Sequence, residues 1–331
     1  MTSAIIQYLP ATCAAATLAA TSTPQSISFN WWEFTLNGLC RGSIYALVAL
    51  GYTMIYGILG MINFAHGEVL MIGMFSTVFG IALATSIWGS NLALNLVFGV
   101  IFAMVICAGF GYANERIAYR RLRGAHRLAP LTTAIGVSII LQNFIMLTVS
   151  KDQVQFPRFY NAWMETTRYG PPGFEITATQ IIILTSSLLV MGVLFYLVNC
   201  TRLGIAMRAT AQDPMMASLC GISVQKVISL TFILASALAA VAGSMLASYQ
   251  GVLHFDNGSP MGLKAFTAAV LGGIGNIPGA VLGGFIIGMA EDLTSISAGS
   301  DWKNLTIFCI LMAVLIFRPR GLLGERVADK V

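Results

Sequence analysis

The stretch INFAHGEVLMIG, residues 62–73, interrupts two long apolar segments of the chain. No Asp, Glu, Lys or Arg occurs from Val69 to Asn114, and residues 42–65 are equally free of them. The interruption contains three polar residues with two glycines around them: Asn63, His66, Glu68, Gly60 and Gly67. Such a stretch is either a polar site kept at membrane depth for function or the turn between two apolar helices.

The composition excludes a soluble globular protein. The 331 residues have a mean hydropathy of +0.80 and only 9% charged residues, whereas a soluble domain carries about 25%. A helix needs about 20 apolar residues to cross the hydrocarbon core, and barrel strands would show ten-residue alternation, which is missing. Uncharged runs of sufficient length occur at 69–114, 128–150, 176–201, 227–253 and 265–290. The sequence therefore predicts an all-α, polytopic transmembrane helical bundle.

Three basic segments predict the orientation of the bundle. Segments 114–127, 200–226 and 318–330 each carry more basic than acidic residues, which places them in the cytoplasm by the positive-inside rule. Loops 151–175 and 291–303 then lie outside. The resulting spans are near 34–57, 66–88, 92–113, 129–150, 178–199, 227–249 and 304–318.

Residues 265–290 must enter from the outer side and return to it, because both flanking loops are predicted outside. The glycine-rich GGIGNIPGA, residues 272–280, interrupts this run, and each half is too short to cross a bilayer alone. We expect a re-entrant or broken helix pair here, which gives about 8–9 membrane segments in all.

An internal repeat relates the two interruptions. LGMINFAHGEVL (59–70) and LGGIGNIPGAVL (271–282) are identical at six of twelve positions, although Gly and Leu are common enough for convergence. Paired helix interruptions in repeated units commonly line transport pathways, and the charge pattern gives both units the same orientation. The residues predicted for the translocation pathway or helix break are Asn63, His66, Gly67, Glu68, Gly272, Gly273, Gly275, Asn276 and Gly279.

The polar residues occur in the first copy alone, and two roles are open for them. Asn63 or Glu68 could satisfy the free N–H groups of a helix that begins near residue 66, where the helix dipole also favours an acid. The stretch could instead be a gate or a substrate contact. His66 and Glu68 are two residues apart and would not share a helix face, which argues against a joint catalytic pair.

Motifs of catalysis and metal binding are missing from the sequence. There is no H-E-x-x-H, no G-x-S-x-G and no phosphate-binding loop, and the six scattered cysteines include no C-x-x-C pair. We expect no catalytic residue, metal or cofactor. If the protein drives transport with ATP, another chain must bind the ATP.

The segment DPMMASLCG, residues 213–221, predicts a short helix in the cytoplasmic loop 200–226. Asp213 suits the N-cap, Pro214 the first helical position and Gly221 the C′ position. A capped helix is more than a linker needs and indicates a docking surface, although a loop can be helical without one.

Five stretches resemble the LivH-type permease of branched-chain amino acid ABC importers: GYTMIYGILGMINFAHGEVLMIG, ERIAYRRLRG, TAIGVSIILQN, RATAQDPMMASLCGI and GLKAFTAAVLGGIGNIPGAVLGG. They occur in the family's order between about residues 35 and 325. The resemblance implies one membrane subunit of an importer in the bacterial inner membrane. Its implied partners are a sister permease, two ATP-binding cassette ATPase subunits, a periplasmic amino-acid-binding protein and the lipid bilayer, with no nucleic acid.

Membrane subunits of such importers commonly carry a coupling loop of the type E-A-A-x-x-x-G. Ala217 and Gly221 fit this pattern, but Met215 and Met216 replace its Glu and first Ala. Apolar docking onto the ATPase remains physically reasonable, because methionine adapts its shape to a groove. The predicted coupling residues are Arg208, Asp213, Met215, Met216, Ala217, Leu219 and Gly221.

We expect residues 1–30 to be an apolar extension or a weak first span, 31–325 the permease domain and 326–331 a cytoplasmic tail. The expected function is passage of leucine, isoleucine or valine in an ATP-driven importer; a urea or short-chain amide importer permease is the alternative. An ion-coupled secondary transporter would need buried ionisable residues that face one another. Inside the apolar region the sequence offers Glu68, with His66, as the candidate.

Overall fold

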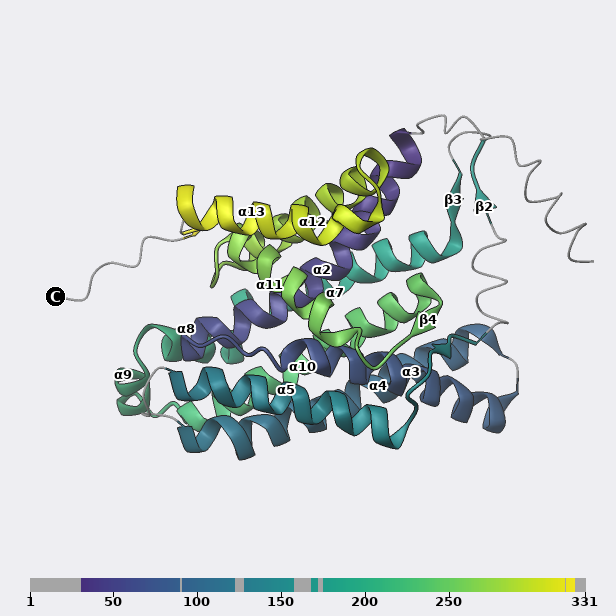
Figure 1. Cartoon of the computed structure of the whole chain (residues 1–331). Helices are drawn as coiled ribbons and strands as arrows, with labels where there is room; N and C mark the ends of the chain where they lie inside the picture. The colour runs from purple at the N-terminus through teal and green to yellow at the C-terminus, as the bar shows by residue number, and fades with distance from the viewer. Residues whose placement is uncertain are drawn as a thin grey trace, which may run out of the picture.

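The computed structural model describes residues 31–89, 91–122, 128–157, 168–171, 175–318 and 320–324. The predicted extension 1–30 and tail 326–331 lie outside these residues. The described chain is almost entirely helical (Figure 1), with eight helices long and apolar enough to cross a membrane. The long helices are α2 (Trp31–Leu59), α3 (His66–Trp88), α4 (Leu92–Asn114), α5 (Leu128–Thr148), α7 (Ala178–Cys200), α10 (Val224–Gln250), α12 (Ile277–Ser297) and α13 (Lys303–Phe317). The predicted all-α, polytopic bundle is confirmed.

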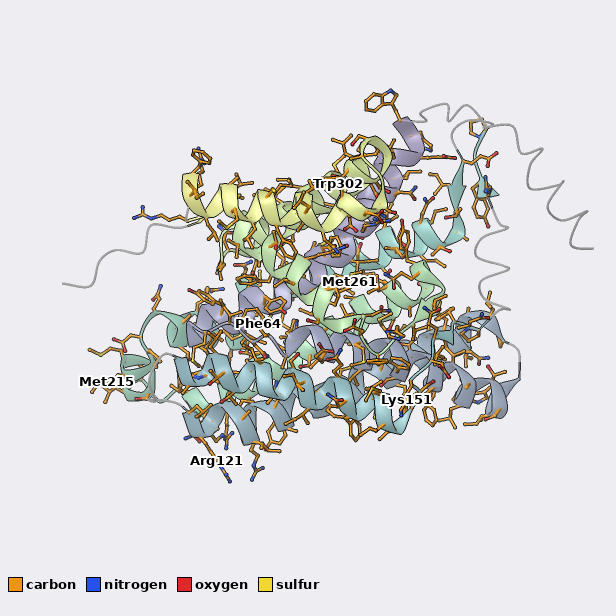
Figure 2. The ribbon with its side chains drawn as sticks, in the orientation of Figure 1. Phe64, Arg121, Lys151, Met215, Met261 and Trp302 are labelled. Carbon is orange, nitrogen blue, oxygen red and sulfur yellow. The ribbon has the colours of Figure 1, made fainter. Side chains whose placement is uncertain are left out.

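Shorter elements connect the long helices. They are a π-helical turn (Glu115–Tyr119), two 3-10 turns (Arg120–Leu122 and Ser300–Trp302), α8 (Arg202–Gln212), α9 (Pro214–Leu219) and α11 (Gly258–Gly272). Two-residue strands form two antiparallel pairs: β1 (Val154–Gln155) with β4 (Val252–Leu253), and β2 (Arg168–Tyr169) with β3 (Ile176–Thr177). Figure 2 places Lys151, close to β1, and Met215, on α9, at opposite ends of the bundle.

The predicted spans agree with the long helices to within three residues at each end, as in the span 66–88 and α3 (His66–Trp88). The agreement reflects long uncharged runs that fill one membrane thickness each. The prediction for 114–127 was wrong in its first half, because residues 115–122 continue the helix of α4 instead of forming a loop. Glu115, which was assigned to the loop, is fully buried and accepts a hydrogen bond from the Ser229 hydroxyl at 2.8 Å.

The broken helix pair is longer than predicted. It comprises α11 and α12, and α12 is long enough to cross a membrane, so the prediction that each half is too short was wrong. Both helices extend into the segments 250–264 and 291–303, which the charges had assigned to outer loops. Lys264 and Glu291 pair with each other inside the protein at 2.9 Å, so neither charge ends its helix. The predicted interruption itself is present, between Gly272 and Ile277.

The helices α2 and α10 are the most buried of the long helices, and α13 and α5 are among the least. Glycines bring neighbouring backbones together at the centre: Gly42 faces the backbone of Phe285, and Gly288 faces the Cα of Gly42. Lipid offers apolar side chains no hydrophobic reason to associate, so close backbone packing of this kind is a main source of attraction between helices. These glycines therefore allow α2 and α12 to pack at close range.

The two repeated units have the same orientation. Going along α2, Gly38 lies near Met289 and Ala46 near Gly284, which makes α12 antiparallel to α2. α11 is antiparallel to α12 as well, because Gly272 packs against Gly279 at the break that joins them. Hence α2 and α11 run parallel, in agreement with the orientation that the charge pattern predicted.

We predict that Gly288→Ala destabilises the protein, because the new Cβ would overlap the backbone of Gly42 on α2. Overpacking of this kind costs about 1–3 kcal/mol. Thermal unfolding of the purified protein in detergent measures the effect. Gly192→Ala on α7 is the matched control, since a Cβ there meets nothing within 4 Å. Equal unfolding temperatures for the two variants would contradict the proposed α2–α12 contact.

Candidate translocation site and coupling helix

The first helix break is a turn that Asn63 organises. α2 ends at Leu59, and Gly60 follows with a φ of 64°, which suits glycine. The side-chain Oδ1 of Asn63 accepts hydrogen bonds from the Ala65 N–H at 3.1 Å and from the Tyr119 hydroxyl at 2.8 Å. Its backbone carbonyl accepts the His66 N–H at 3.1 Å. The turn is thus closed from within and tied to the end of α4.

Glu68 does not cap the helix on which it lies. Its Oε1 accepts a hydrogen bond from the Ser138 hydroxyl of α5 at 3.2 Å, and its Oε2 lies against Gly258 in the first turn of α11. Of the two candidates for satisfying the N–H groups at the start of α3, Glu68 is wrong, because its side chain points to two other helices. Asn63 is the one that accepts such an N–H group, that of Ala65, the N-cap residue of α3.

His66 is completely buried in the protein. Its ring packs edge-on against Tyr52 with 4.9 Å between the centroids, and it occupies the space that Gly51 leaves open on α2. Neither ring nitrogen has a hydrogen-bond partner among the described residues. Because His66 faces α2 and Glu68 faces α5 and α11, the two do not act on a common atom.

The second helix break is closed by the chain's own C-terminal segment. Gly273 and Gly275 have φ values of 106° and 99°, and the Asn276 side chain accepts the Gly279 N–H at 3.2 Å to cap α12. Asn276 also donates to the Leu323 carbonyl at 2.8 Å. The Leu323 N–H in turn donates to the carbonyl of Gly272 at 3.0 Å. This break is sealed by backbone contacts.

The two breaks lie side by side in the fold. A Cβ on Gly57, close to the end of α2, would be 4.0 Å from the Cα of Gly275. A small cavity of about 10 Å³ separates them, with Tyr56 and Ile62 on one side and Ala269 and Ile274 on the other. The repeat units thus bring both of their interruptions to one place.

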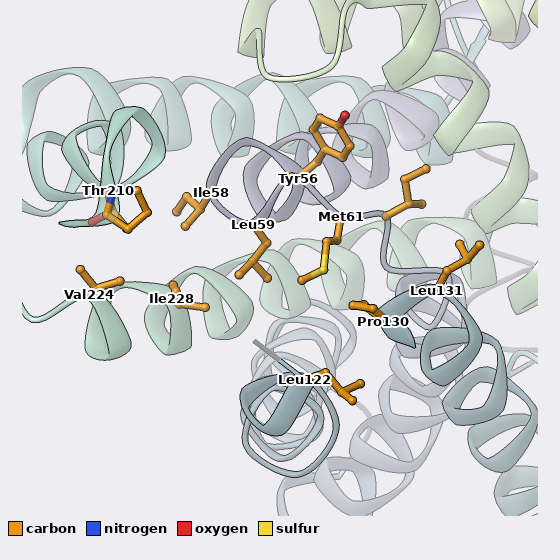
Figure 3. Close-up of a pocket in the computed structure, with 13 residues that line it drawn as sticks. Tyr56, Ile58, Leu59, Met61, Leu122, Pro130, Leu131, Thr210, Val224 and Ile228 are labelled. Atoms are coloured by element: carbon orange, nitrogen blue, oxygen red, sulfur yellow. The ribbon is translucent and has the colours of Figure 1, made fainter. Parts of the chain in front are cut away.

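A larger cavity of about 720 Å³ borders the first break (Figure 3). This volume lies within the range of small-molecule sites, about 300–1,000 Å³. Its wall combines the end of α2, the starts of α5 and α10, and the junction of α8 and α9. Most of the lining side chains are apolar, among them Leu59, Met61, Leu122, Leu131, Val224 and Ile228. The cavity is therefore an apolar space of small-molecule size at the end of the bundle where α8 meets α9.

The predicted helix at 213–221 is present as α9. Asp213 Oδ1 accepts the N–H groups of Met215 at 2.8 Å and of Met216 at 3.1 Å. At the other end Gly221 has a φ of 83°, and the Ile222 N–H reaches the Ala217 carbonyl at 3.0 Å. This is a Schellman ending, which requires a left-handed residue at the glycine position.

The helix α9 presents apolar side chains outward. Met215 and Leu219 are each 74% exposed and Met216 is 61% exposed, whereas Ala217 packs inward. Figure 2 shows Met215 at the tip of the bundle. Arg208, the remaining predicted coupling residue, lies on α8 and donates to the Val198 carbonyl of α7. It joins two helices of this chain instead of adding to the α9 surface.

Three buried charged residues and the partly buried Arg41 form a cluster that the sequence analysis missed. Arg41 Nη1 lies 3.2 Å from Glu291 Oε1 and 3.1 Å from Asp292 Oδ1, and Lys264 Nζ lies 2.9 Å from the same Glu291 oxygen. The Tyr45 hydroxyl donates to the second Glu291 oxygen. We call Arg41, Lys264, Glu291 and Asp292 the ion cluster. The one sequence signal for the ion cluster was Arg41, a charged residue inside the otherwise apolar span 34–57.

The fold and these sites define a polytopic helical membrane protein with paired helix breaks and a short helix, α9, whose exposed side chains are apolar. The family model "Branched-chain amino acid transport system / permease component" matches residues 34–315. The chain belongs to this family, whose members are transport components.

Curated relatives match nearly the whole chain. The branched-chain amino acid permease BraD of Pseudomonas aeruginosa is 43% identical over 92% of this chain and 99% of its own length. The permease LivH of Escherichia coli K12 is 45% identical over 89% of this chain and 96% of its own. Among solved structures, the PsaBC complex of Streptococcus pneumoniae with a Fab gives a TM-score of 0.40 at 14% identity, covering 88% and 94% of the two chains.

We predict that Glu291→Ala strongly destabilises the protein, since it leaves the buried Lys264 without its partner and Arg41 with Asp292 alone. Removing one member of a buried pair costs about 3–5 kcal/mol. Glu175→Ala is the control, because Glu175 pairs at 2.8 Å with Arg168 on the surface, where both are exposed and such a pair adds little. Thermal unfolding in detergent compares them; shifts of equal size would argue against the ion cluster as a structural element.

Proposed function

We propose that this chain is a membrane-spanning permease subunit of an ATP-driven ABC importer for branched-chain amino acids in the bacterial inner membrane. The observation that carries the proposal is the 43–45% identity to branched-chain amino acid permeases over about nine-tenths of the chain. The apolar wall of the 720 Å³ cavity supports it, because leucine, isoleucine and valine have apolar side chains. The permease domain is residues 31–325.

The proposed assembly contains this chain, a sister permease, two ATP-binding cassette ATPase subunits and a periplasmic amino-acid-binding protein. Within it, α9 docks on an ATPase through Met215, Met216 and Leu219, which are exposed and apolar. Pro214, the first residue of α9, also lines the large cavity. A displacement of α9 by the ATPase would therefore act directly on the cavity wall beside the first break.

The test of the substrate is uptake into proteoliposomes that contain the coexpressed complex. We expect ATP to drive import of leucine, isoleucine and valine when the binding protein is added. Import of urea or acetamide in their place would show that the complex belongs to the alternative importer class. Uptake by this chain alone in response to an ion gradient would contradict an ATP-driven importer.

The test of α9 is the substitution Leu219→Asp. Leu219 is exposed, so we expect normal membrane insertion but reduced copurification of the ATPase subunits, because a carboxylate at this position disfavours an apolar contact. Gln225→Asp, at the start of α10, is the control, since it adds the same charge at the same end of the bundle outside α9. Undiminished ATPase assembly of the Leu219 variant would refute docking through α9.

A further inference from the structure

One face of α5 joins two carboxylates that lie far apart in the sequence. Ser138 donates to Glu68 on α3 at 3.2 Å, and four residues later Gln142 donates to Asp256 in the loop before α11 at 2.7 Å. Positions four apart lie one above the other on a helix. We call Glu68, Ser138, Gln142 and Asp256 the polar strip.

The polar strip lies among apolar side chains of α5. Ile135, Ile139, Ile140 and Leu147 are exposed and apolar, as a helix surface in contact with lipid should be. Carboxylates and amides in hydrocarbon are expensive, and inside membranes they normally face protein or water. The face of α5 that carries the strip is therefore expected to line an aqueous or protein-enclosed space.

The strip contains acceptors without a cation. Glu68 is fully buried, and its Oε2 has no hydrogen-bond partner among the described residues. Within the part of the chain that the structure describes, neither Glu68 nor Asp256 forms an ion pair. The ion cluster differs, because there Arg41 and Lys264 balance the charges of two acids. A buried carboxylate oxygen without a donor costs stability, which a positively charged donor from outside the chain would recover.

The strip and the large cavity follow one another along α5. Pro130 and Leu131 line the cavity, and Ser138 lies seven residues beyond Leu131. At 1.5 Å per residue this separation is about 10 Å. Met61, in the first break, also lines the cavity, and Glu68 of the strip lies seven residues after it in the chain. The strip and the apolar cavity are therefore neighbours along α5 and along the first break.

We propose that the polar strip holds the ammonium group of an amino acid during its passage, while the apolar side chain moves towards the large cavity. A primary ammonium carries three N–H donors and a positive charge, and it would pair with Glu68 and Asp256 by charge-assisted hydrogen bonds. The strip would then distinguish amino acids from uncharged amides within the membrane. This inference rests on the proposed function.

The experiment measures leucine imported per ATP hydrolysed by the complete complex in proteoliposomes at saturating binding protein. Asp256→Asn and Glu68→Gln remove the negative charge and keep the shape, and we expect each to lower this ratio roughly tenfold. Asp256→Glu keeps the charge and should stay within about twofold of the unaltered complex. Asn143→Ala is the control on the same helix, because among the described residues the Asn143 side chain bonds only its own helix, at the Ile139 carbonyl.

The outcomes distinguish binding of the ammonium group by the polar strip from a purely structural role of its residues. Because Asp256 is exposed, its neutral variant should assemble even if the buried Glu68 variant does not. If the unaltered complex imports leucine but Asp256→Asn keeps the ratio, the inference is overturned and the proposed function stands. Import and ATP hydrolysis that fall together at constant ratio would overturn it as well. If the unaltered complex carries urea instead of leucine, the proposed function fails and this inference with it.

Discussion

The pairing of Arg41 and Lys264 with one carboxylate, Glu291, is the interaction on which the arrangement of the helices depends. It joins α2, α11 and α12 through contacts of 3.2 Å and 2.9 Å. A charge inside a membrane protein is costly unless it is paired, so none of these helices can slide along another without separating a pair. The same pairing carries α11 and α12 beyond the ends that hydropathy alone would give them. Glycine contacts such as Gly42 with Phe285 then bring the backbones together.

With these helices in register, the two helix breaks lie side by side, but different groups close them. The first is closed by the Asn63 side chain and adjoins the 720 Å³ cavity. The second is closed by the C-terminal segment through the Leu323 backbone and side-chain contacts of Asn276. The first break therefore borders a cavity, while the second is covered by the C-terminal segment. His66 and Glu68 accompany the first break alone, since Pro278 and Ala280 take their places in the second copy.

The short helix α9 and the large cavity lie at the same end of the bundle. α9 is capped at both ends, by Asp213 and by the turn at Gly221. Its outward side chains are apolar, and its first residue, Pro214, touches the cavity. In the proposed importer the ATPase thus has a short mechanical route to the first break.

The sequence by itself determined the helical class, the long spans, the position of both breaks and the caps of α9, because each depends on residues close together in the chain. The tertiary structure alone decided which polar groups meet. Glu68 accepts a hydrogen bond from Ser138, seventy positions away, instead of capping α3. Lys264 on α11 pairs with Glu291 on α12, on the other side of the second break. Charges at 264, 291 and 292 suggested loop ends, because a charge in an isolated helix is best solvated by water. Once the helices pack, a partner of opposite sign replaces that water, and hydropathy contains no information about the partner.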